Sequence, residues 1–277
     1  MTITAGIDVG STYTKVVLLG DAGRIIGSAM IPTGFRLEEA AEQAYSAALR
    51  HAEVGRDDVA YVVSTGAGRY QVPFRDLQAT DLTAHARGAR HLFPATRTVL
   101  DVGGQTMKAS RLDERGRVAA FRLNDKCAAG TGAFLEKTAR YLGYRTEQIG
   151  PLAVSSSEAA SISGVCAVFA ESEVINHVTA GRPPADILHG AMVSLVTRCV
   201  QLIKRVKLEP EVTLVGGIMR YPTMIRVLKE QLAREVNVPD DALAQMTGAI
   251  GAAVLGRQRL AKVNLSLIHI SEPTRPY

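Results

Sequence analysis

The apolar positions along the chain follow two periods, one typical of strands and one typical of helices. Extended apolar runs begin almost at the N-terminus, in "TITAGIDV", and recur as "YVVST" and "VTLV", each followed by a glycine turn. Apolar residues at helical spacing predict helices at 37–53, 80–93 (with Thr80 or Asp81 as N-cap), 133–143, 168–180, 187–207 and 222–235, and a Gly/Ala-rich last helix that ends near Lys262. Strands that alternate with helices predict an α/β protein.

Two segments of the chain are copies of one another. "DVGSTYTKVVLLGDAGR" begins at Asp8 and "DVGGQTMKASRLDERGR" begins at Asp101, and the two align without a gap. Each copy follows an apolar run and continues through a glycine turn into a third extended run, "IIGSAMI" or "VAAFRL". The pattern predicts two related units, each with a hairpin, a third strand and helices. We expect an N-terminal subdomain at 1–95 and a C-terminal subdomain at 96–262.

The last residues, 263–277, read "VNLSLIHISEPTRPY". They join an apolar patch to a proline-containing end after the last predicted helix, and they look like translated vector or sequencing-adapter sequence. We expect this tail to be non-native; the alternative is a short native β-like tail.

Composition narrows the classes of function. The 277 residues carry a net charge of +5, but the basic residues are scattered, which does not favour a nucleic-acid surface. Aromatic residues make up 5% and tryptophan is absent, so stacking platforms for single-stranded nucleic acid are not expected. No apolar run has the length of a membrane span, and no signal peptide precedes the first strand. We expect a cytoplasmic protein without nucleic-acid or membrane partners.

The turn after each repeated strand has the composition of a phosphate-binding loop. An Asp at the strand end, followed by glycine and small polar residues, offers backbone N–H groups to phosphate oxygens, and its carboxylate suits Mg²⁺, usually through water. One such loop alone is also a common hairpin, but two in one chain can hold the phosphates of one nucleotide. Gln105, in the second copy, could orient an attacking water.

Two further glycine motifs extend this pattern. "GTG" at 130–132 leads into a predicted helix, with Glu136 one turn later, and a glycine-rich helix entry is typical of an anion site. "LVGGI" ends a buried strand, where Gly216 and Gly217 would let the backbone approach an adenosine; alone it is a plain strand-to-helix turn. The four motifs in this order resemble the actin/Hsp70/sugar-kinase ATPase superfamily, which implies duplicated ribonuclease-H-like domains. The sequence has neither a Walker A pattern nor a Rossmann opening after the first strand.

The three cysteines are Cys127, Cys166 and Cys199. An odd number in an apparently cytosolic chain argues against a disulfide framework. Cys127 and Cys166 each precede a helical pattern, whose N-terminus would stabilise a thiolate. Two thiols per chain complete a four-thiolate cluster only in a dimer, and the alternative is two buried structural cysteines. Cys199 lies on the apolar side of the predicted helix 187–207 and is expected in the core.

Six motifs together resemble one family: "GIDVGSTYTK", "DVGGQTMK", "NDKCAAGTGAFLE", "CAVFAESEVI", "LVGGI" and "GAIGAA". They are similar to the BcrAD/BadFG-type ATPases, which include the 2-hydroxyacyl-CoA dehydratase activators and the ATPase subunits of ATP-dependent benzoyl-CoA reductase. The resemblance covers about residues 3–260. It implies an ATPase-coupled oxidoreductase subunit that delivers low-potential electrons for the reduction of an aromatic acyl-CoA, as in anaerobic aromatic degradation.

The resemblance also implies cofactors and partners. ATP and Mg²⁺ would bind to the chain, and Cys127 and Cys166 would be ligands of a [4Fe-4S] cluster shared between two protomers. The partners would be a related ATPase subunit in a homo- or heterodimer, a ferredoxin-type electron donor, and a catalytic component that reduces or dehydrates the acyl-CoA.

Carried over by motif, the resemblance assigns roles to individual residues. Asp8, Asp101 and Gln105 would be catalytic. The nucleotide would be bound by Gly10, Ser11, Thr12, Lys15, Gly103, Gly104, Gly130, Thr131, Gly132, Glu136, Gly216 and Gly217. The activators usually have an Asp after "GGQ", where this chain has Thr106. Either Asp8 and Asp101 alone would serve Mg²⁺, or this protomer would hydrolyse ATP less readily.

Segments 83–89 and 172–190 look more like a D-type ATPase chain of benzoyl-CoA reductase than a stand-alone activator, which implies a heterodimer. The alternatives are an activator of a 2-hydroxyacyl-CoA dehydratase, an N-acetylhexosamine-type kinase of the same fold, and a nucleotide-gated scaffold without turnover. The kinase interpretation leaves Cys127 and Cys166 unexplained. His85, His177 and His189 lie on predicted helices, and we expect surface or packing roles for them, with no ligand role.

Overall fold

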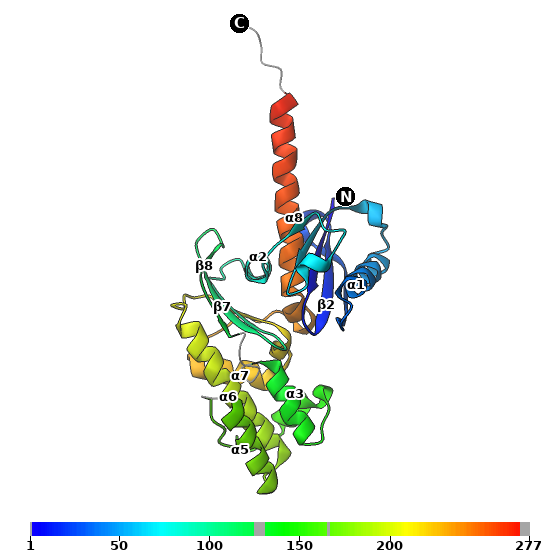
Figure 1. The fold of residues 1–277 in the computed structure, drawn as a ribbon. Coiled ribbons are helices and arrows are strands. Elements are labelled where there is room, and N and C mark those ends of the chain that lie inside the picture. The colour runs from blue at the N-terminus through cyan, green and yellow to red at the C-terminus, as the bar shows by residue number, and fades with distance from the viewer. Residues whose placement is uncertain (1, 125–130, 165–166, 272–277) are drawn as a thin grey trace. The chain divides into compact units, whose positions relative to one another are not determined.

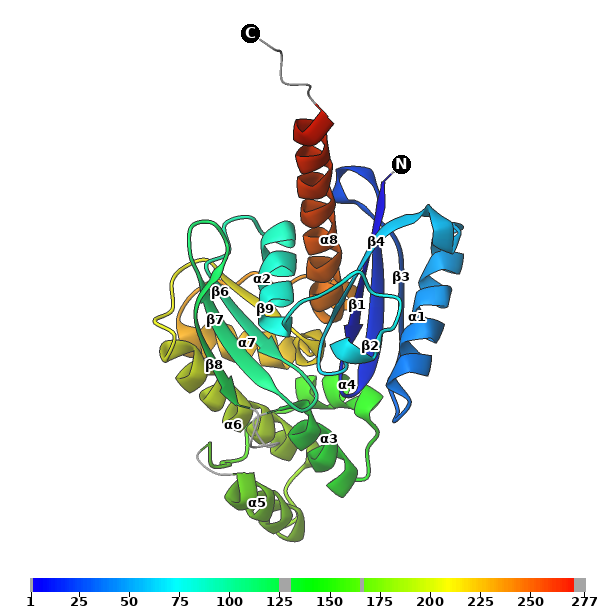
Figure 2. The same cartoon turned by 45° about the horizontal axis from the view of Figure 1, so that its top comes forward.

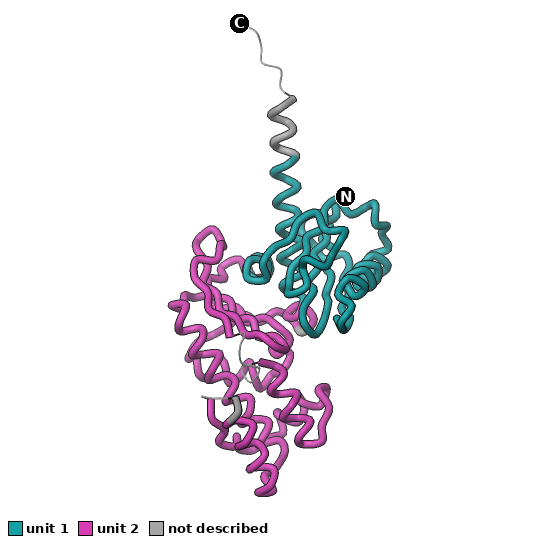
Figure 3. The backbone as a smooth tube through the Cα atoms, in the orientation of Figure 1, with its two compact units in different colours: residues 1–91, 246–277 teal, residues 92–245 magenta. Residues whose placement is uncertain are grey.

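The computed structural model describes residues 2–124, 131–164 and 167–271. The chain divides into two compact units, residues 1–91 with 246–277 and residues 92–245 (Figure 3). These units differ from the predicted subdomains mainly at the C-terminal end, because residues from Met246 onward pack in the first unit. The prediction placed that stretch in the second subdomain, since sequence order carries no signal for a chain that returns to its first unit.

The first unit contains a five-stranded sheet of order β3-β2-β1-β4-β5. The strands are β1 (Ile3–Val9), β2 (Tyr13–Leu19), β3 (Ile25–Pro32), β4 (Val59–Thr65) and β5 (Leu77–Gln78). β1, β2 and β3 are antiparallel neighbours, whereas β4 lies parallel to β1 and β5 parallel to β4. β1 is the central strand (Figure 1) and is buried along its whole length, as its uninterrupted apolar run predicts.

Three helices belong wholly or partly to the first unit. α1 (Leu37–Ala52) packs on β2 and β3 through an alanine-rich face (Figure 2). α2 (Asp81–Leu92) begins after Thr80, whose Oγ1 accepts a hydrogen bond of 3.3 Å from the N–H of Thr83, so the predicted N-cap is confirmed. α8 (Asp241–Ser271) enters this unit at Met246 and continues beyond the predicted end at Lys262.

Glycines let α8 approach β1 and α2 at backbone distance. A Cβ on Gly6 of β1 would lie 1.9 Å from the carbonyl oxygen of Ala249, and a Cβ on Gly251 would lie 1.7 Å from that of Ala84. Gly88 of α2 has the same relation to Thr247, at 2.0 Å. Any side chain at these positions would overlap the neighbouring backbone, so the packing of the first unit requires glycine there.

The second unit repeats the sheet order of the first in four strands, β8-β7-β6-β9. The strands are β6 (Thr98–Val102), β7 (Met107–Leu112), β8 (Val118–Asn124) and β9 (Val212–Val215). The helices are α3 (Gly132–Tyr141), α4 (Ile149–Val154), α5 (Ala167–Thr179), α6 (Pro184–Lys204) and α7 (Pro222–Leu232). The duplicated sheet order confirms what the two copies in the sequence predict.

α6 is the central helix of the second unit and contacts α3, α4, α5, α7 and the sheet. It is also apolar and long enough to pass a length-and-composition test for a membrane span. Within its most apolar window 78% is buried, which is the character of a core helix.

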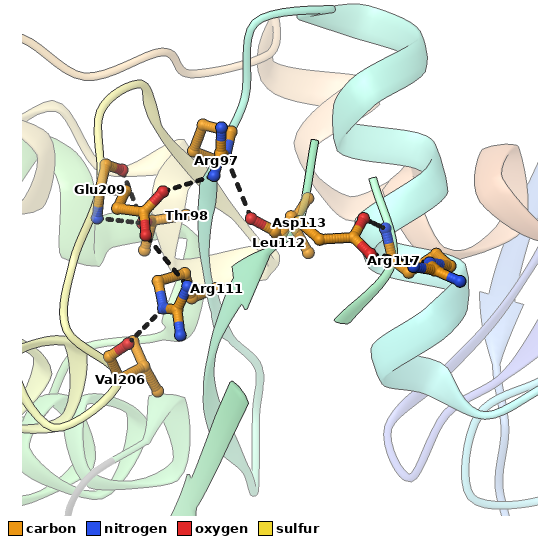
Figure 4. A network of polar contacts seen from close by, with 8 residues as sticks. All are labelled: Arg97, Thr98, Arg111, Leu112, Asp113, Arg117, Val206 and Glu209. Carbon is orange, nitrogen blue, oxygen red and sulfur yellow. Dashed lines mark hydrogen bonds and ion pairs between the residues drawn. The ribbon is translucent and has the colours of Figure 1, made fainter. Parts of the chain in front are cut away.

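An ion-pair network fastens the chain just before β9 to the neighbouring strands (Figure 4). Glu209 accepts hydrogen bonds from Arg97 at 2.6 Å and from Arg111 at 3.0 Å. The Thr98 hydroxyl donates to the Glu209 carbonyl at 2.7 Å and accepts from its N–H at 2.9 Å. Arg111 also donates to the carbonyl of Val206 at 3.0 Å. Several contacts on one residue fix the entry into β9 and hence the parallel register of β9 on β6.

We predict that Gly251→Ala lowers the free energy of unfolding by about 1–3 kcal/mol, because the added methyl group overlaps the backbone of α2. Thermal and urea denaturation followed by circular dichroism will measure the loss. Gly150→Ala is the matched control, because a Cβ there meets nothing closer than 3.4 Å. Equal destabilisation of both variants would contradict the packing argument.

Candidate functional site

The first candidate loop is the turn between β1 and β2. The strands pair up to Val9 and Thr14, and the N–H of Gly10 closes the turn on the carbonyl of Tyr13 at 3.1 Å. Asp8, the register partner of Lys15, is only 4% exposed, and the Lys15 Nζ lies 3.1 Å from its Oδ2. The ammonium group compensates much of the cost of burying this carboxylate.

The second candidate loop, between β6 and β7, has the same construction. The N–H of Gly103 donates to the carbonyl of Thr106 at 2.9 Å, so Thr106 occupies the closing position of the turn. Asp101 is 6% exposed, and the Lys108 Nζ lies 3.5 Å from its Oδ2. Lys108 was not among the predicted site residues, although its identity with Lys15 in the repeat is a sufficient signal.

The predicted loop residues lie in these two turns. Ser11, Thr12 and Gln105 are exposed, whereas Gly10, Gly103 and Gly104 are partly buried. Exposed hydroxyl, amide and backbone groups beside a buried carboxylate form a polar surface suited to phosphate oxygens.

A glycine after the neighbouring parallel strand contacts each buried carboxylate. Gly66 follows β4 with φ +88°, and a Cβ there would lie 2.5 Å from Asp8 Oδ1. Gly216 follows β9 with φ +99°, and a Cβ there would lie 2.7 Å from Asp101 Oδ1. The duplication therefore includes the strand-end glycine as well as the hairpin. Sequence reasoning missed the role of Gly66, although "VVSTG" and "TLVGG" both show a strand running into glycine.

The helix after "GTG" begins on the second loop. The N–H groups of Gly132 and Ala133 donate to the carbonyls of Gly103 and Gly104 at 2.9 and 2.8 Å. These first donors of α3 are thus already used to fix the loop. Thr131 is buried and Glu136 partly buried, and Gly130 lies outside the described residues.

The "LVGGI" turn is tied to the start of α8. The N–H of Gly216 donates to the carbonyl of Ala244 at 2.9 Å, and a Cβ on Gly217 would lie 3.5 Å from Gln245 Oε1. Gln245 was not a predicted site residue, and only the tertiary fold brings it to this turn.

The cysteines divide into two groups. Cys127 and Cys166 lie outside the described residues. Cys199 is fully buried in the core, and burial raises the pKa of its thiol to about 12, so the predicted core role is confirmed. Within the described ranges, no group of three or more His, Cys, Asp or Glu side chains could hold a metal ion.

The segment 156–164, which we call the strap, is held along α6 on the approach to Cys166. It contacts one stripe of α6 at a spacing of four residues: Asp186, Gly190, Ser194 and Arg198. The Asp186 carboxylate accepts from the Ser156 hydroxyl at 2.8 Å and from the next two backbone N–H groups. A Cβ on Gly190 would lie 2.1 Å from the carbonyl oxygen of Ala160.

The end of the strap is fixed by α5 as well as α6. The Ser194 hydroxyl donates to the carbonyl of Ser163 at 2.6 Å, and Arg198 Nε donates to that of Gly164 at 2.8 Å. From α5, Glu173 accepts from the N–H of Ser163, and the His177 ring contacts the Ser161 carbonyl at 2.9 Å. His177 is therefore a packing residue, as predicted.

Comparisons with known proteins agree with this construction. The family model described as the BadF/BadG/BcrA/BcrD ATPase family matches residues 5–256. The chain belongs to this ATPase family. The family predicted from the six motifs is thus confirmed.

Two relatives mark the range of this ATPase family. A 2-hydroxyisocaproyl-CoA dehydratase activator from Clostridioides difficile is 38% identical over 91% of this chain and 93% of its own length. The D-type ATPase chain of benzoyl-CoA reductase from Thauera aromatica is 37% identical over 95% of this chain and 96% of its own length. The identities do not separate the two types of relative.

Solved structures confirm the predicted fold class. The activator of the 2-hydroxyisocaproyl-CoA dehydratase from Clostridium difficile, with bound ADPNP, has a TM-score of 0.89 at 35% identity, covering 99% of this chain and 100% of that chain. A ROK family glucokinase from Streptomyces griseus, at 14% identity over 92% of this chain and 99% of that chain, has a TM-score of 0.53 and shares the fold alone. This BadF/BadG/BcrA/BcrD-type ATPase therefore has the duplicated α/β fold of the sugar-kinase superfamily.

We predict a pH-dependent effect of Asp186→Asn. The Ser156 hydroxyl, followed by backbone N–H groups, lowers the pKa of Asp186 below its ordinary value of 3.8. The ionised carboxylate therefore contributes stability above pH 3.8, and this contribution is lost as the pH falls through the folded-state pKa. Melting temperatures should differ between the variant and the wild type at neutral pH and converge in strong acid. Asp57→Asn, at an exposed position, should show no such gap at neutral pH, and a gap for Asp186→Asn that persists in acid would contradict the charge argument.

Proposed function

We propose that this chain hydrolyses ATP at the loops that follow Asp8 and Asp101 and couples hydrolysis to low-potential electron delivery for reduction of an aromatic acyl-CoA. One observation carries the proposal. Both units present the same device, a buried Asp paired with a Lys across a hairpin and contacted by a strand-end glycine. A fold that only needed two hairpins would have no reason to bury a carboxylate twice, because buried charge is costly.

The residues around Asp8 fit a hydrated Mg²⁺ ion. Carboxylate oxygens and water are the ligands that Mg²⁺ prefers. Thr65 is the register partner of Asp8 on β4, and its buried hydroxyl has no hydrogen-bond partner among the residues that the structure describes. Because an unsatisfied buried hydroxyl is unfavourable, a water or ion-bound water beside Asp8 would stabilise this place. Bound Mg²⁺ would neutralise phosphate charge.

Each part of the chain has a stated task in this proposal. Backbone N–H groups and hydroxyls of 10–12 and 103–105 bind phosphate oxygens, and Lys15 adds a positive charge. Gln105, exposed at its turn, orients the attacking water. Gly216 and Gly217 let the backbone lie against the adenosine. Thr131, Gly132 and Glu136 line the start of α3, next to the second loop.

We predict that Asp8→Asn and Asp101→Asn each lower kcat for ATP hydrolysis by about 10²-fold, because each removes a charge that orders the phosphate site. Steady-state phosphate release will measure the effect. Asp113→Asn is the matched control, since Asp113 lies in the β7–β8 turn and pairs with Arg117 of the same turn. Loss of activity in the control alone, or in none of the variants, would contradict the assignment.

We further propose that Cys127 and Cys166 bind half of a [4Fe-4S] cluster that a second protomer completes. Thiolates are the usual ligands of such clusters, and one chain supplies two outside the buried Cys199. Two described features support the proposal: α3 begins shortly after Cys127, and the strap is fixed on two helices up to Gly164. The cluster would receive an electron from a ferredoxin-type donor and supply it to the catalytic component.

We predict that Cys166→Ala abolishes bound iron after anaerobic reconstitution, whereas Cys199→Ala keeps it. Iron counting and electron paramagnetic resonance will measure cluster content, and gel filtration will report the dimer. A cluster that survives in Cys166→Ala would disprove the ligand assignment.

Segments 83–89 and 172–190 favour the benzoyl-CoA reductase type, whereas the relatives support an activator of a 2-hydroxyacyl-CoA dehydratase equally. We propose the reductase type, with the activator as the second candidate. Electron-transfer assays with each class of catalytic component separate the two.

A further inference from the structure

His85 of α2 lies beside the buried carboxylate of the first loop. Gly248 of α8 separates the two side chains: a Cβ on Gly248 would lie 3.1 Å from Asp8 Oδ2 and 3.1 Å from His85 Nε2. The two atoms are therefore at most about twice this distance apart and face the same space over a glycine. No sequence pattern indicates this proximity, because the three residues come from β1, α2 and α8.

The hydrogen bond on the other side of the ring defines the chemistry of Nε2. His85 Nδ1 lies 2.9 Å from the carbonyl oxygen of Asp81, one turn earlier in α2. A carbonyl oxygen only accepts hydrogen bonds, so Nδ1 carries the hydrogen. In the neutral ring, Nε2 is then an acceptor that lies toward Asp8.

A water molecule suits the space that these two acceptors share. Asp8 Oδ2 accepts from Lys15 at 3.1 Å, and a carboxylate oxygen has a second acceptor site. Water can donate one hydrogen to Nε2 and the other to the carboxylate. The unsatisfied hydroxyl of Thr65, on the strand next to Asp8, independently indicates that a polar group belongs here.

Close backbone packing holds the ring in place. Gly251 lies against Ala84, and Gly88 lies against Thr247, so α2 and α8 contact each other on both sides of the His85–Gly248 level. A ring on a helix fixed in this way loses little further freedom when it binds a water.

We propose that His85 is a positioning residue of the first phosphate loop, which orients water at the Asp8 carboxylate and thereby supports a hydrated Mg²⁺ ion with its nucleotide. This inference rests on the proposed ATP site and adds to it a residue outside the two loops. Partners of this outer kind typically change metal affinity by about 10- to 100-fold.

The test compares His85→Phe, which keeps a ring without nitrogen, with His85→Gln, which restores an acceptor. His91→Phe is the matched control on the same helix, because His91 contacts the Gly23 carbonyl at 3.1 Å. Two readouts are needed: the Mg²⁺ concentration for half-maximal ATP hydrolysis, and the rise in melting temperature caused by ADP with Mg²⁺ over ADP with a chelator.

We expect His85→Phe to raise the half-maximal Mg²⁺ concentration by about tenfold and to reduce the Mg²⁺-dependent rise in melting temperature. His85→Gln should recover most of both, and His91→Phe should match the wild type. Gly248→Ala places a methyl group between Asp8 and His85 and should reproduce the defect with the ring present, which keeps the test open if His85→Phe does not fold.

Wild-type Mg²⁺ dependence in His85→Phe or in Gly248→Ala would overturn the inference and leave the ATPase proposal intact. A lower melting temperature with unchanged Mg²⁺ dependence would also overturn it, because that is the signature of packing alone. A wild-type protein that neither hydrolyses ATP nor responds to ADP with Mg²⁺ would overturn both.

Discussion

A buried carboxylate at the end of a central strand is the constraint around which each unit is arranged. Such a charge is unfavourable in a protein interior unless a counter-charge compensates it. Lys15 and Lys108 meet this need from the register-opposed position of the next strand, which fixes the hairpin as well as the charge. The neighbouring parallel strand must then end in glycine, because its backbone lies against the same carboxylate.

Small residues solve a second problem, which is how helices come close to this site. In the first unit, Gly6, Gly88 and Gly251 let α8 lie at backbone distance from β1 and α2. In the second unit, Gly190 does the same for the strap on α6. The two units thus use close packing to fix the loops and segments next to their candidate chemistry, rather than the chemistry itself.

Much of the fold could be predicted because its signals are local. The apolar runs marked the strands, Thr80 marked the start of α2, and the repeat marked two related sheets. The prediction was weaker where a contact joins distant residues. It placed the residues after Met246 in the second subdomain, whereas they pack in the first. It also missed Gly66, Lys108 and Gln245, and it assigned His85 only a surface or packing role.

The family, the duplicated fold and the positions of the two candidate phosphate loops follow from the amino-acid sequence alone, because motif order and the internal repeat are properties of the chain. Tertiary packing was needed to show that Gly248 joins Asp8 to His85, and that one stripe of α6 holds the strap before Cys166. The difference comes from separation along the chain. Hydrophobic period and turn chemistry act over a few residues, whereas these contacts arise only when separate elements pack against one another.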